Sequence, residues 1–179
     1  MTLNSLETGL AHVSESPTHA GEVHLIVQRP AQGKRKIVDN AEIDETQGLI
    51  GDNWRSRGSR RSPDGSANPN AQITLMNSRA AALVAGTRDR WALAGDQIYT
   101  DLDLSEDNLP PGTQLKVGTA TIEVSDQPHT GCVKFKTHFG DDALKFVNSE
   151  TGRSLRLRGM NARVIESGKV SLGDKVEKL

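Results

Sequence analysis

The residues best suited to chemistry lie in one short stretch, Gln127–Phe135. It contains Cys132, the only cysteine of the chain, with His129 three positions before it and Lys134 two positions after it. A thiolate can act as a nucleophile, carry a persulfide or ligate a soft metal. His129 or Lys134 would favour the thiolate if its side chain pointed at the sulfur. The stretch therefore predicts a pocket built around a thiol, with Cys132 and His129 as candidate catalytic residues and Cys132 as a candidate metal ligand.

Other interpretations of this cysteine stay open. A single cysteine is more often a small buried hydrophobic residue than a reactive group. A zinc site is disfavoured: although His129 and Cys132 have ligand-like spacing and His138 is nearby, structural zinc sites usually draw on several cysteines. One cysteine also excludes an internal disulfide.

A second candidate group is the basic segment Gly152–Arg163. Its arginines are Arg153, Arg156, Arg158 and Arg163. A strand over Leu155–Leu157 would place Arg156 and Arg158 on one face, which Asn161 and Arg163 would extend. That face is either solvated or a pair of guanidinium forks for a phosphate or a carboxylate.

Two further segments allow a structural and a functional interpretation. Gly48–Trp54 is either a tight turn, in which Asp52 accepts backbone hydrogen bonds, or the wall of a pocket. The loop 55–70 is either a solvated excursion or a cover for an anion. Its arginines are Arg55, Arg57, Arg60 and Arg61.

The elements that would position these groups are mainly short strands. Leu115 and Val117, then Ala120, Ile122 and Val124, alternate with polar residues around Gly118-Thr119, which predicts a hairpin that leads directly to the cysteine stretch. The other expected strands are Glu22–Gln28, Lys34–Val38 with Ala41–Ile43, Gln72–Met76, Leu155–Leu157, Ala162–Ile165 and Lys169–Leu172. The expected helices are one within residues 1–20, one over Ala80–Ala85 and one from Asp141 that Gly152 ends. This pattern predicts a mainly β fold, a closed barrel with a few short helices.

Composition narrows the class of protein. The chain has 179 residues, with 22 Lys and Arg against 23 Asp and Glu, a balance that argues against a general nucleic-acid binder. The chain contains no apolar run long enough for a membrane span and no signal-peptide pattern at its start. We therefore expect a cytoplasmic protein with one domain over residues 1–179, because neither a linker nor a repeat interrupts the sequence.

Taken in order, these segments resemble those of MOSC domains, the family named after the C-terminal domain of molybdenum-cofactor sulfurases. The resemblance extends from Val23 to Val176 and is to the short, stand-alone bacterial type. The matching segments are Gly48–Asp52, Gln72–Met76, Gly95–Leu104, Leu115–Val124, Pro128–Cys132, Arg158–Val164 and Gly168–Asp174.

The resemblance implies a closed MOSC-type β-barrel whose pocket is lined by a cysteine. In the family this cysteine is associated with sulfur transfer to the molybdenum cofactor, or with ligation of molybdenum in enzymes that reduce N-hydroxylated compounds; the role carries over to Cys132. Basic residues of such pockets hold the anionic pterin phosphate, and Lys134, Arg156 and Arg158 are the nearest candidates by position.

The chain departs from the larger family members. It is shorter than the reductases and has no iron–sulfur cysteines or appended domain, so an electron donor would be a separate protein. Pyridoxal phosphate is a family-level association only, because 179 residues are too few for the pyridoxal-phosphate domain of the large sulfurases. The alternative function is a non-catalytic β-barrel module for a small anionic ligand. A homodimer is compatible with the sequence.

Overall fold

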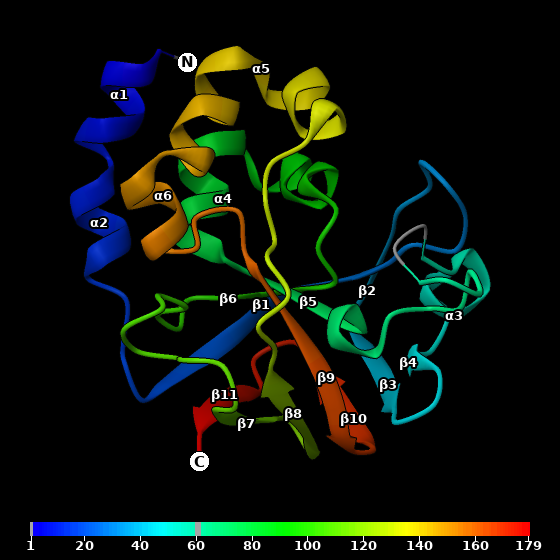
Figure 1. Ribbon diagram of the computed structural model, residues 1–179. Helices are drawn as coiled ribbons and strands as arrows, with labels where there is room; N and C mark the ends of the chain where they lie inside the picture. Colours follow the sequence, from blue (N-terminus) through cyan, green and yellow to red (C-terminus); the bar gives the residue numbers. More distant parts are fainter. Residues whose placement is uncertain (1, 60–61) are drawn as a thin grey trace.

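A closed β-barrel forms the centre of the computed structural model, which describes residues 2–59 and 62–179 (Figure 1). Seven strands follow one another around it in the order β11-β7-β8-β9-β5-β6-β1, and β1 pairs back to β11. Their bounds are β1 (Ala20–Gln28), β5 (Ile73–Asn77), β6 (Ile98–Thr100), β7 (Gln114–Val117), β8 (Ala120–Val124), β9 (Met160–Glu166) and β11 (Lys175–Lys178). β5 and β6 run parallel, whereas β1 pairs antiparallel with both β6 and β11, so the barrel is mixed.

Additional strands extend this barrel. β2 (Lys36–Val38) pairs antiparallel with the end of β1. A separate three-stranded sheet has the order β10-β3-β4 and consists of β10 (Gly168–Ser171), β3 (Asn40–Asp44) and β4 (Gly48–Leu49). The mainly β, closed-barrel prediction is therefore confirmed.

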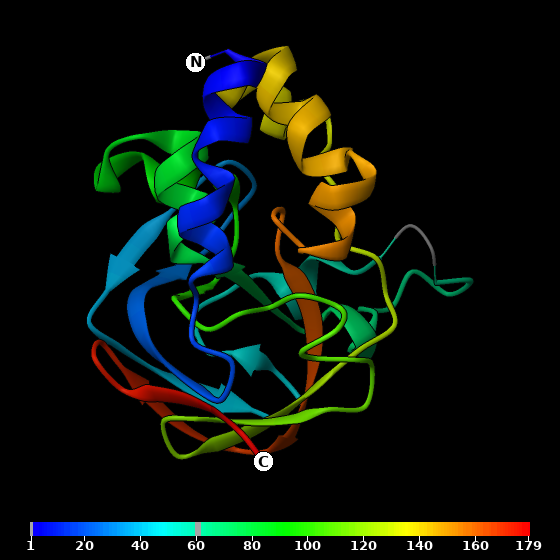
Figure 2. The same ribbon diagram turned by 90° about the vertical axis from the view of Figure 1, so that its left-hand side faces the viewer.

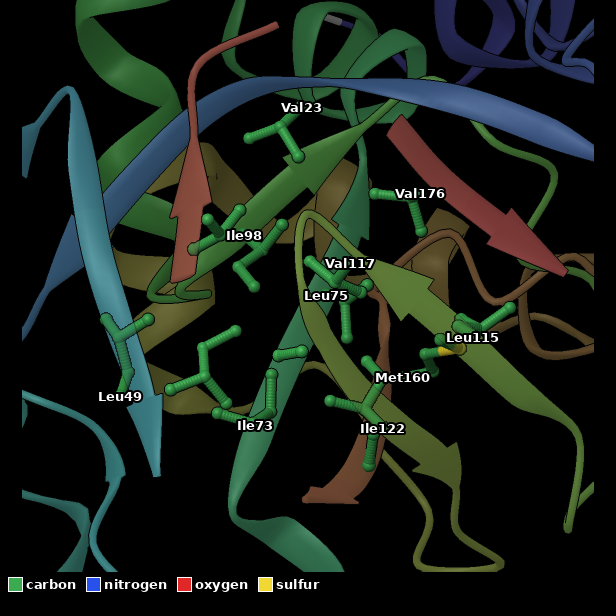
Figure 3. Packing of buried hydrophobic residues seen from close by; sticks show 14 of the residues in the cluster. Val23, Leu49, Ile73, Leu75, Ile98, Leu115, Val117, Ile122, Met160 and Val176 are labelled. Atoms are coloured by element: carbon green, nitrogen blue, oxygen red, sulfur yellow. The ribbon is translucent and has the colours of Figure 1, made fainter. Parts of the chain in front are cut away.

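The barrel interior is filled by inward-facing side chains of these strands (Figure 3). Ile73 and Leu75 of β5 and Ile98 of β6 are fully buried there. Because successive strand residues point to opposite faces, Met76 of β5 and Leu25 of β1 face away from the interior and join a second hydrophobic core.

The helices cover one end of the barrel, where this second core lies (Figures 1 and 2). They are α1 (Leu3–Thr8), α2 (Leu10–Ser14), α4 (Ser78–Ala85), α5 (Val133–Asn148) and α6 (Glu150–Ser154), with the 3₁₀ helix η2 (Arg88–Ala94). Asn77 caps α4, since its side chain accepts hydrogen bonds from the backbone N–H groups of Arg79 and Ala80, and Gly86 ends the helix as expected. Away from this end lie α3 (Trp54–Arg57) and the short 3₁₀ helix η1 (Pro69–Ala71).

The predicted hairpin is present, but the predicted strand over Leu155–Leu157 is wrong. β7 and β8 pair antiparallel on either side of Gly118-Thr119, with Leu115 opposite Ile122. Residues 155–158 instead form a turn between α6 and β9. Arg156 has φ +46°, a left-handed conformation that an extended strand does not contain. Arg156 and Arg158 therefore do not share a strand face.

The helix after the cysteine begins earlier than predicted. α5 starts at Val133, directly after Cys132, and is interrupted at Gly140, where φ is +89°. Gly152 does not end it: this residue lies within α6, and a Cβ there would approach the Phe146 carbonyl oxygen to 2.2 Å. The glycine is needed for close helix packing rather than for termination.

Three other segments complete the comparison with the sequence predictions. Asp52 confirms the turn interpretation, since its carboxylate accepts from the backbone N–H of Trp54 at 2.9 Å. The C-terminal strand β11 was not predicted from the sequence, yet it closes the barrel between β1 and β7. Within the loop 55–70, Arg60 and Arg61 lie outside the described residues.

Candidate functional site

A cavity of about 520 Å³ lies between the segment that precedes Cys132 and the turn before β9. Its lining residues are Glu106, Pro111, Ser125, Asp126, Gln127, Pro128, His129, Thr130, Val147, Gly152, Arg153, Arg156, Gly159, Met160 and Asn161. Cavities of roughly 300–1,000 Å³ with a few convergent polar groups are typical small-molecule sites. The lining mixes both signs of charge with amide and imidazole groups, so it suits a polar ligand.

One side of the cavity is basic. Arg156 donates from Nη1 to the carbonyl oxygens of Leu109 at 2.7 Å and Leu104 at 3.3 Å, which fixes its guanidinium. Burial lowers the pKa of Arg156, while the charge of Glu106 opposes that shift. Arg153, from α6, is exposed, and neither arginine forms an ion pair with a carboxylate of the described residues. Within the described residues, no carboxylate therefore neutralises either guanidinium by an ion pair, although Nη1 of Arg156 is already hydrogen-bonded.

A buried polar cluster lies beside the cavity and contains His129, Asp96 and Arg158. Asp96 is fully buried, and its Oδ2 atom accepts from Arg158 Nη1 at 2.5 Å. Its Oδ1 atom faces His129 Nδ1 at 3.5 Å. Burial and the charge of Arg158 lower the pKa of His129 to about 4, although Asp96 opposes the shift. The imidazole is therefore neutral at physiological pH.

The thiol lies just beyond the cavity. Cys132 is exposed at the N-cap of α5 and is not a lining residue, whereas Thr130 is. Two residues of chain span at most about 8 Å between Cα atoms, so the thiol stays near the cavity. The intervening Gly131 is clamped by Asn148, which accepts from its N–H at 2.9 Å and donates to its carbonyl oxygen at 3.1 Å.

The structure brings only some of the predicted site residues together. His129, Arg156 and Asn161 line the cavity. Asn161 Nδ2 donates to the carbonyl oxygens of Gln127 at 3.0 Å and Pro128 at 3.3 Å, so it holds the cavity wall in place.

The other three predicted cofactor-binding residues are not among the lining residues. Lys134 is exposed on α5, close in sequence to Cys132. Arg158 is engaged by Asp96 and by the carbonyl oxygen of Ala94. Arg163 lies on the outer face of β9, where Nη2 forms an ion pair with Glu123 at 2.7 Å.

Asp96 and Glu106 were not singled out from the sequence. Asp96 follows η2 and meets Arg158 62 residues further along the chain, so no local spacing indicates their contact. A buried aspartate next to a glycine turn is also a common structural residue. Arg153 belongs to the predicted basic segment. It lines the cavity because it lies on α6, a helix that the sequence did not predict.

A smaller cavity of about 180 Å³ adjoins the first one and shares three of its lining residues, Gln127, Pro128 and Asn161. Arg57 and Trp54 of α3 also line it, so one end of the arginine-containing loop borders this hollow. Over the described ranges 2–59 and 62–179, no three or more His, Cys, Asp and Glu side chains gather as a metal-binding group. No helix in the described part of the chain has the length and apolar character that a membrane crossing needs.

Fold and cavity together define a small β-barrel protein with a partly basic cavity near an exposed thiol. The sequence pattern of the MOSC domain matches residues 66–177, which is more than half of the chain. The protein belongs to the MOSC domain family. No curated protein sequence matches it significantly.

Solved structures share the same fold. The YUAD protein from Bacillus subtilis superposes with a TM-score of 0.65 at 14% identity, over 89% of this chain and 95% of that one. YiiM from Escherichia coli superposes with a TM-score of 0.56 at 23% identity, over 88% of this chain and 69% of that one. YiiM from Geobacillus stearothermophilus superposes with a TM-score of 0.54 at 19% identity, over 89% of this chain and 73% of that one. At these identities the likeness establishes the fold alone.

Proposed function

We propose that this MOSC protein binds the molybdenum cofactor in the 520 Å³ cavity, with Cys132 as the thiolate that ligates the metal or carries sulfur. The observation that supports it most is the pair Arg153 and Arg156, two guanidinium groups without ion-pair partners among the described residues, on a cavity two residues from the thiol. Planar guanidinium forks match the geometry of a phosphate.

The lining offers a partner for each chemical part of this cofactor. Arg153 and Arg156 suit its phosphate, whereas the carboxylates of Glu106 and Asp126 suit the N–H-rich edge of its pterin. A thiolate is a ligand that soft metal centres favour, so Cys132 suits the metal. When bound, the cofactor would supply two-electron redox chemistry at the metal, which the Cys132 thiolate would ligate. His129 is neutral and adds no third positive charge beside the two arginines.

Loading of the protein with metal and pterin tests the proposal. Protein from a host that makes the cofactor is analysed for molybdenum by mass spectrometry and for pterin by fluorescence after oxidation. We expect the double variant Arg153→Gln/Arg156→Gln to lose at least about tenfold in both, since two charge-assisted contacts of roughly 1.5–3 kcal/mol each disappear. Cys132→Ser is expected to lose molybdenum.

The matched control is Arg163→Gln. It removes an arginine from the outer face of β9 and should leave loading unchanged. If the wild-type protein contains neither molybdenum nor pterin, the cofactor assignment is wrong. Equal loss in the control would mean that net charge, and not the cavity, governs loading.

A second candidate function is a non-catalytic module for a small anionic ligand. The exposure of Cys132 and its position outside the lining favour this alternative. Titration with a pterin monophosphate separates the two functions. If the protein is a non-catalytic module, Cys132→Ala retains the wild-type affinity for the pterin monophosphate and Arg156→Gln weakens it. If the thiol ligates the metal, Cys132→Ala also impairs metal loading.

For the reaction we propose sulfur transfer or the reduction of N-hydroxylated compounds, the two activities associated with the family. Reduction would need electrons from a separate donor protein. We further propose a cytoplasmic location, which a single unpaired cysteine suits. The homodimer remains a proposal that sedimentation measurements can test.

A further inference from the structure

The buried cluster beside the cavity contains three polar atoms without a hydrogen-bond partner: Asp96 Oδ1, His129 Nδ1 and Arg158 Nε. Two of them, Asp96 Oδ1 and His129 Nδ1, lie 3.5 Å apart and face each other. Unsatisfied buried polar atoms are costly, so a native protein retains them mainly where they serve a purpose. His129 of this pair lines the cavity, whereas Asp96 is not among the lining residues.

The surroundings of Asp96 fix the direction of each carboxylate oxygen. Oδ2 accepts from Arg158 Nη1, while Arg158 Nη2 donates to the Ala94 carbonyl oxygen at 2.7 Å. Arg158 is held from its other face by the ring of Phe135, whose centroid lies 5.1 Å from the guanidinium carbon. With the guanidinium held in this way, only Oδ1 is left to face the imidazole.

A carboxylate accepts hydrogen bonds and donates none, so Nδ1 must carry the proton if it is to bond to Asp96. A neutral imidazole then has an unprotonated Nε2, which points away from Asp96 and acts as an acceptor. The His129 side chain keeps 16% of its surface exposed, and its Nδ1 atom is buried without a hydrogen-bond partner.

We propose that Asp96 is a positioning residue that selects the Nδ1–H tautomer of His129, so that Nε2 accepts a hydrogen bond from an N–H or O–H group of the ligand in the cavity. The anionic part of the ligand thereby binds the arginines, and an N–H or O–H group of the ligand donates a hydrogen bond to His129. The inference rests on the proposed function only in treating the cavity as the ligand site.

The tautomer is measured directly, without any ligand. Long-range ¹H–¹⁵N correlation spectra of labelled protein distinguish protonated from unprotonated ring nitrogens, and His129→Asn identifies the His129 signals. In the wild type at pH 7 we expect a protonated Nδ1 and an unprotonated Nε2. The groups that act on this ring are Arg158, Asp96, Arg29 and the backbone of Met160, and the pattern should persist down to about pH 5.

Asp96→Asn gives the sharpest test. Arg158 can only donate, so it will hold the amide oxygen of the new side chain and turn the NH₂ group toward His129. Nδ1 must then accept, which moves the proton to Nε2; an Asp→Asn change beside a catalytic histidine selects the wrong tautomer in the same way. We expect the two ¹⁵N resonances of His129 to exchange their protonated and unprotonated positions.

Asp52→Asn is the matched control. The Asp52 side chain is also fully buried and paired with an arginine, Arg29, at 2.7 Å, but its hydrogen bonds go to Arg29 and to the backbone of Trp54 rather than to His129. This variant should keep the wild-type tautomer.

A wild-type spectrum with protonated Nε2, or an unchanged tautomer in folded Asp96→Asn, overturns the inference. If Asp96→Asn does not fold, the wild-type spectrum still decides. Failure of metal and pterin loading would leave this result intact, so the two proposals fail separately.

Discussion

The charge of Arg158 forms a buried ion pair inside the protein. Its guanidinium contacts the carboxylate of Asp96, the carbonyl oxygen of Ala94 and the ring of Phe135, and its side chain is 8% exposed. The residue therefore links the turn before β9 to the start of β6 and to α5. Its sequence neighbour Arg156 lies on the cavity instead, so nearby arginines of the basic segment have different environments.

Arg158→Met should destabilise the protein strongly. Loss of the guanidinium leaves the Asp96 carboxylate buried without its partner, and breaking a buried pair costs on the order of 3–5 kcal/mol. Urea denaturation measures the free energy of unfolding. Arg163→Met provides the comparison, because its exposed ion pair with Glu123 contributes about 0–1 kcal/mol. Similar losses in the two variants would contradict the structural role of Arg158.

His129 should make stability depend on pH over a defined range. Its pKa falls to about 4 in the folded state, against about 6.5 unfolded. Between these values the unfolded chain binds a proton that the folded protein does not, so stability falls as the pH drops from about 6.5 toward 4. The full effect is on the order of 3 kcal/mol and is absent above pH 7.

His129→Asn keeps a donor toward Asp96 but cannot titrate. The difference in unfolding free energy between wild type and variant, measured by urea denaturation from pH 7 to 4, isolates the histidine from the carboxylates. We expect the difference to shift in favour of the variant as the pH falls. A pH-independent difference would show that His129 titrates normally in the folded protein.

The turn between α6 and β9 is the element that shapes the cavity. It contains Arg156 at φ +46° and Gly159 at φ +106°. A Cβ on Gly159 would approach the Leu75 carbonyl oxygen of β5 to 2.3 Å and His129 Nδ1 to 3.3 Å. The backbone of this turn thus packs directly on the barrel and on the imidazole.

Gly159→Ala should therefore cost more than its backbone conformation alone. Gly112 has a similar φ of +90°, but a methyl group added there would meet no atom within 4 Å, so Gly112→Ala reports the conformational cost, roughly 1 kcal/mol. We expect the loss at Gly159 to be larger by at least about 1 kcal/mol, because backbone atoms must move. Thermal unfolding of both variants measures the difference, and equal losses would exclude a steric contribution.

For the whole molecule, alternation of apolar residues was enough to predict the barrel, because the alternating apolar side chains of β7 and β8 all belong to the barrel core. It was not enough for β11, whose four residues contain a single buried side chain, Val176. Closure by so short a strand depends on partners far along the chain, β1 and β7.

The site was predictable only in part for the same reason. His129 and Cys132 are neighbours in sequence, so their stretch was visible, and Asn161 and Arg156 do line the cavity. Asp96 was not identified because its partners come from distant segments. Strand periodicity predicts one arginine face in the basic segment, but residues 150–154 form a helix and residues 155–158 form a turn before β9, so that face does not exist.

The two hydrophobic cores share strands, and this has a consequence for how the molecule opens. β1 places Val23 and Ile26 in the barrel and Leu25 and Val27 under the helices. The amides of this strand become exposed only when both cores open, so their exchange requires nearly global unfolding.

Native-state hydrogen exchange should therefore show the slowest amides in β1 and β5, with exchange free energies near the global value. The amides of α1 and α2, whose buried side chains belong to the second core, should exchange through smaller openings. Faster exchange in β1 than in α1 would mean that the cores open independently.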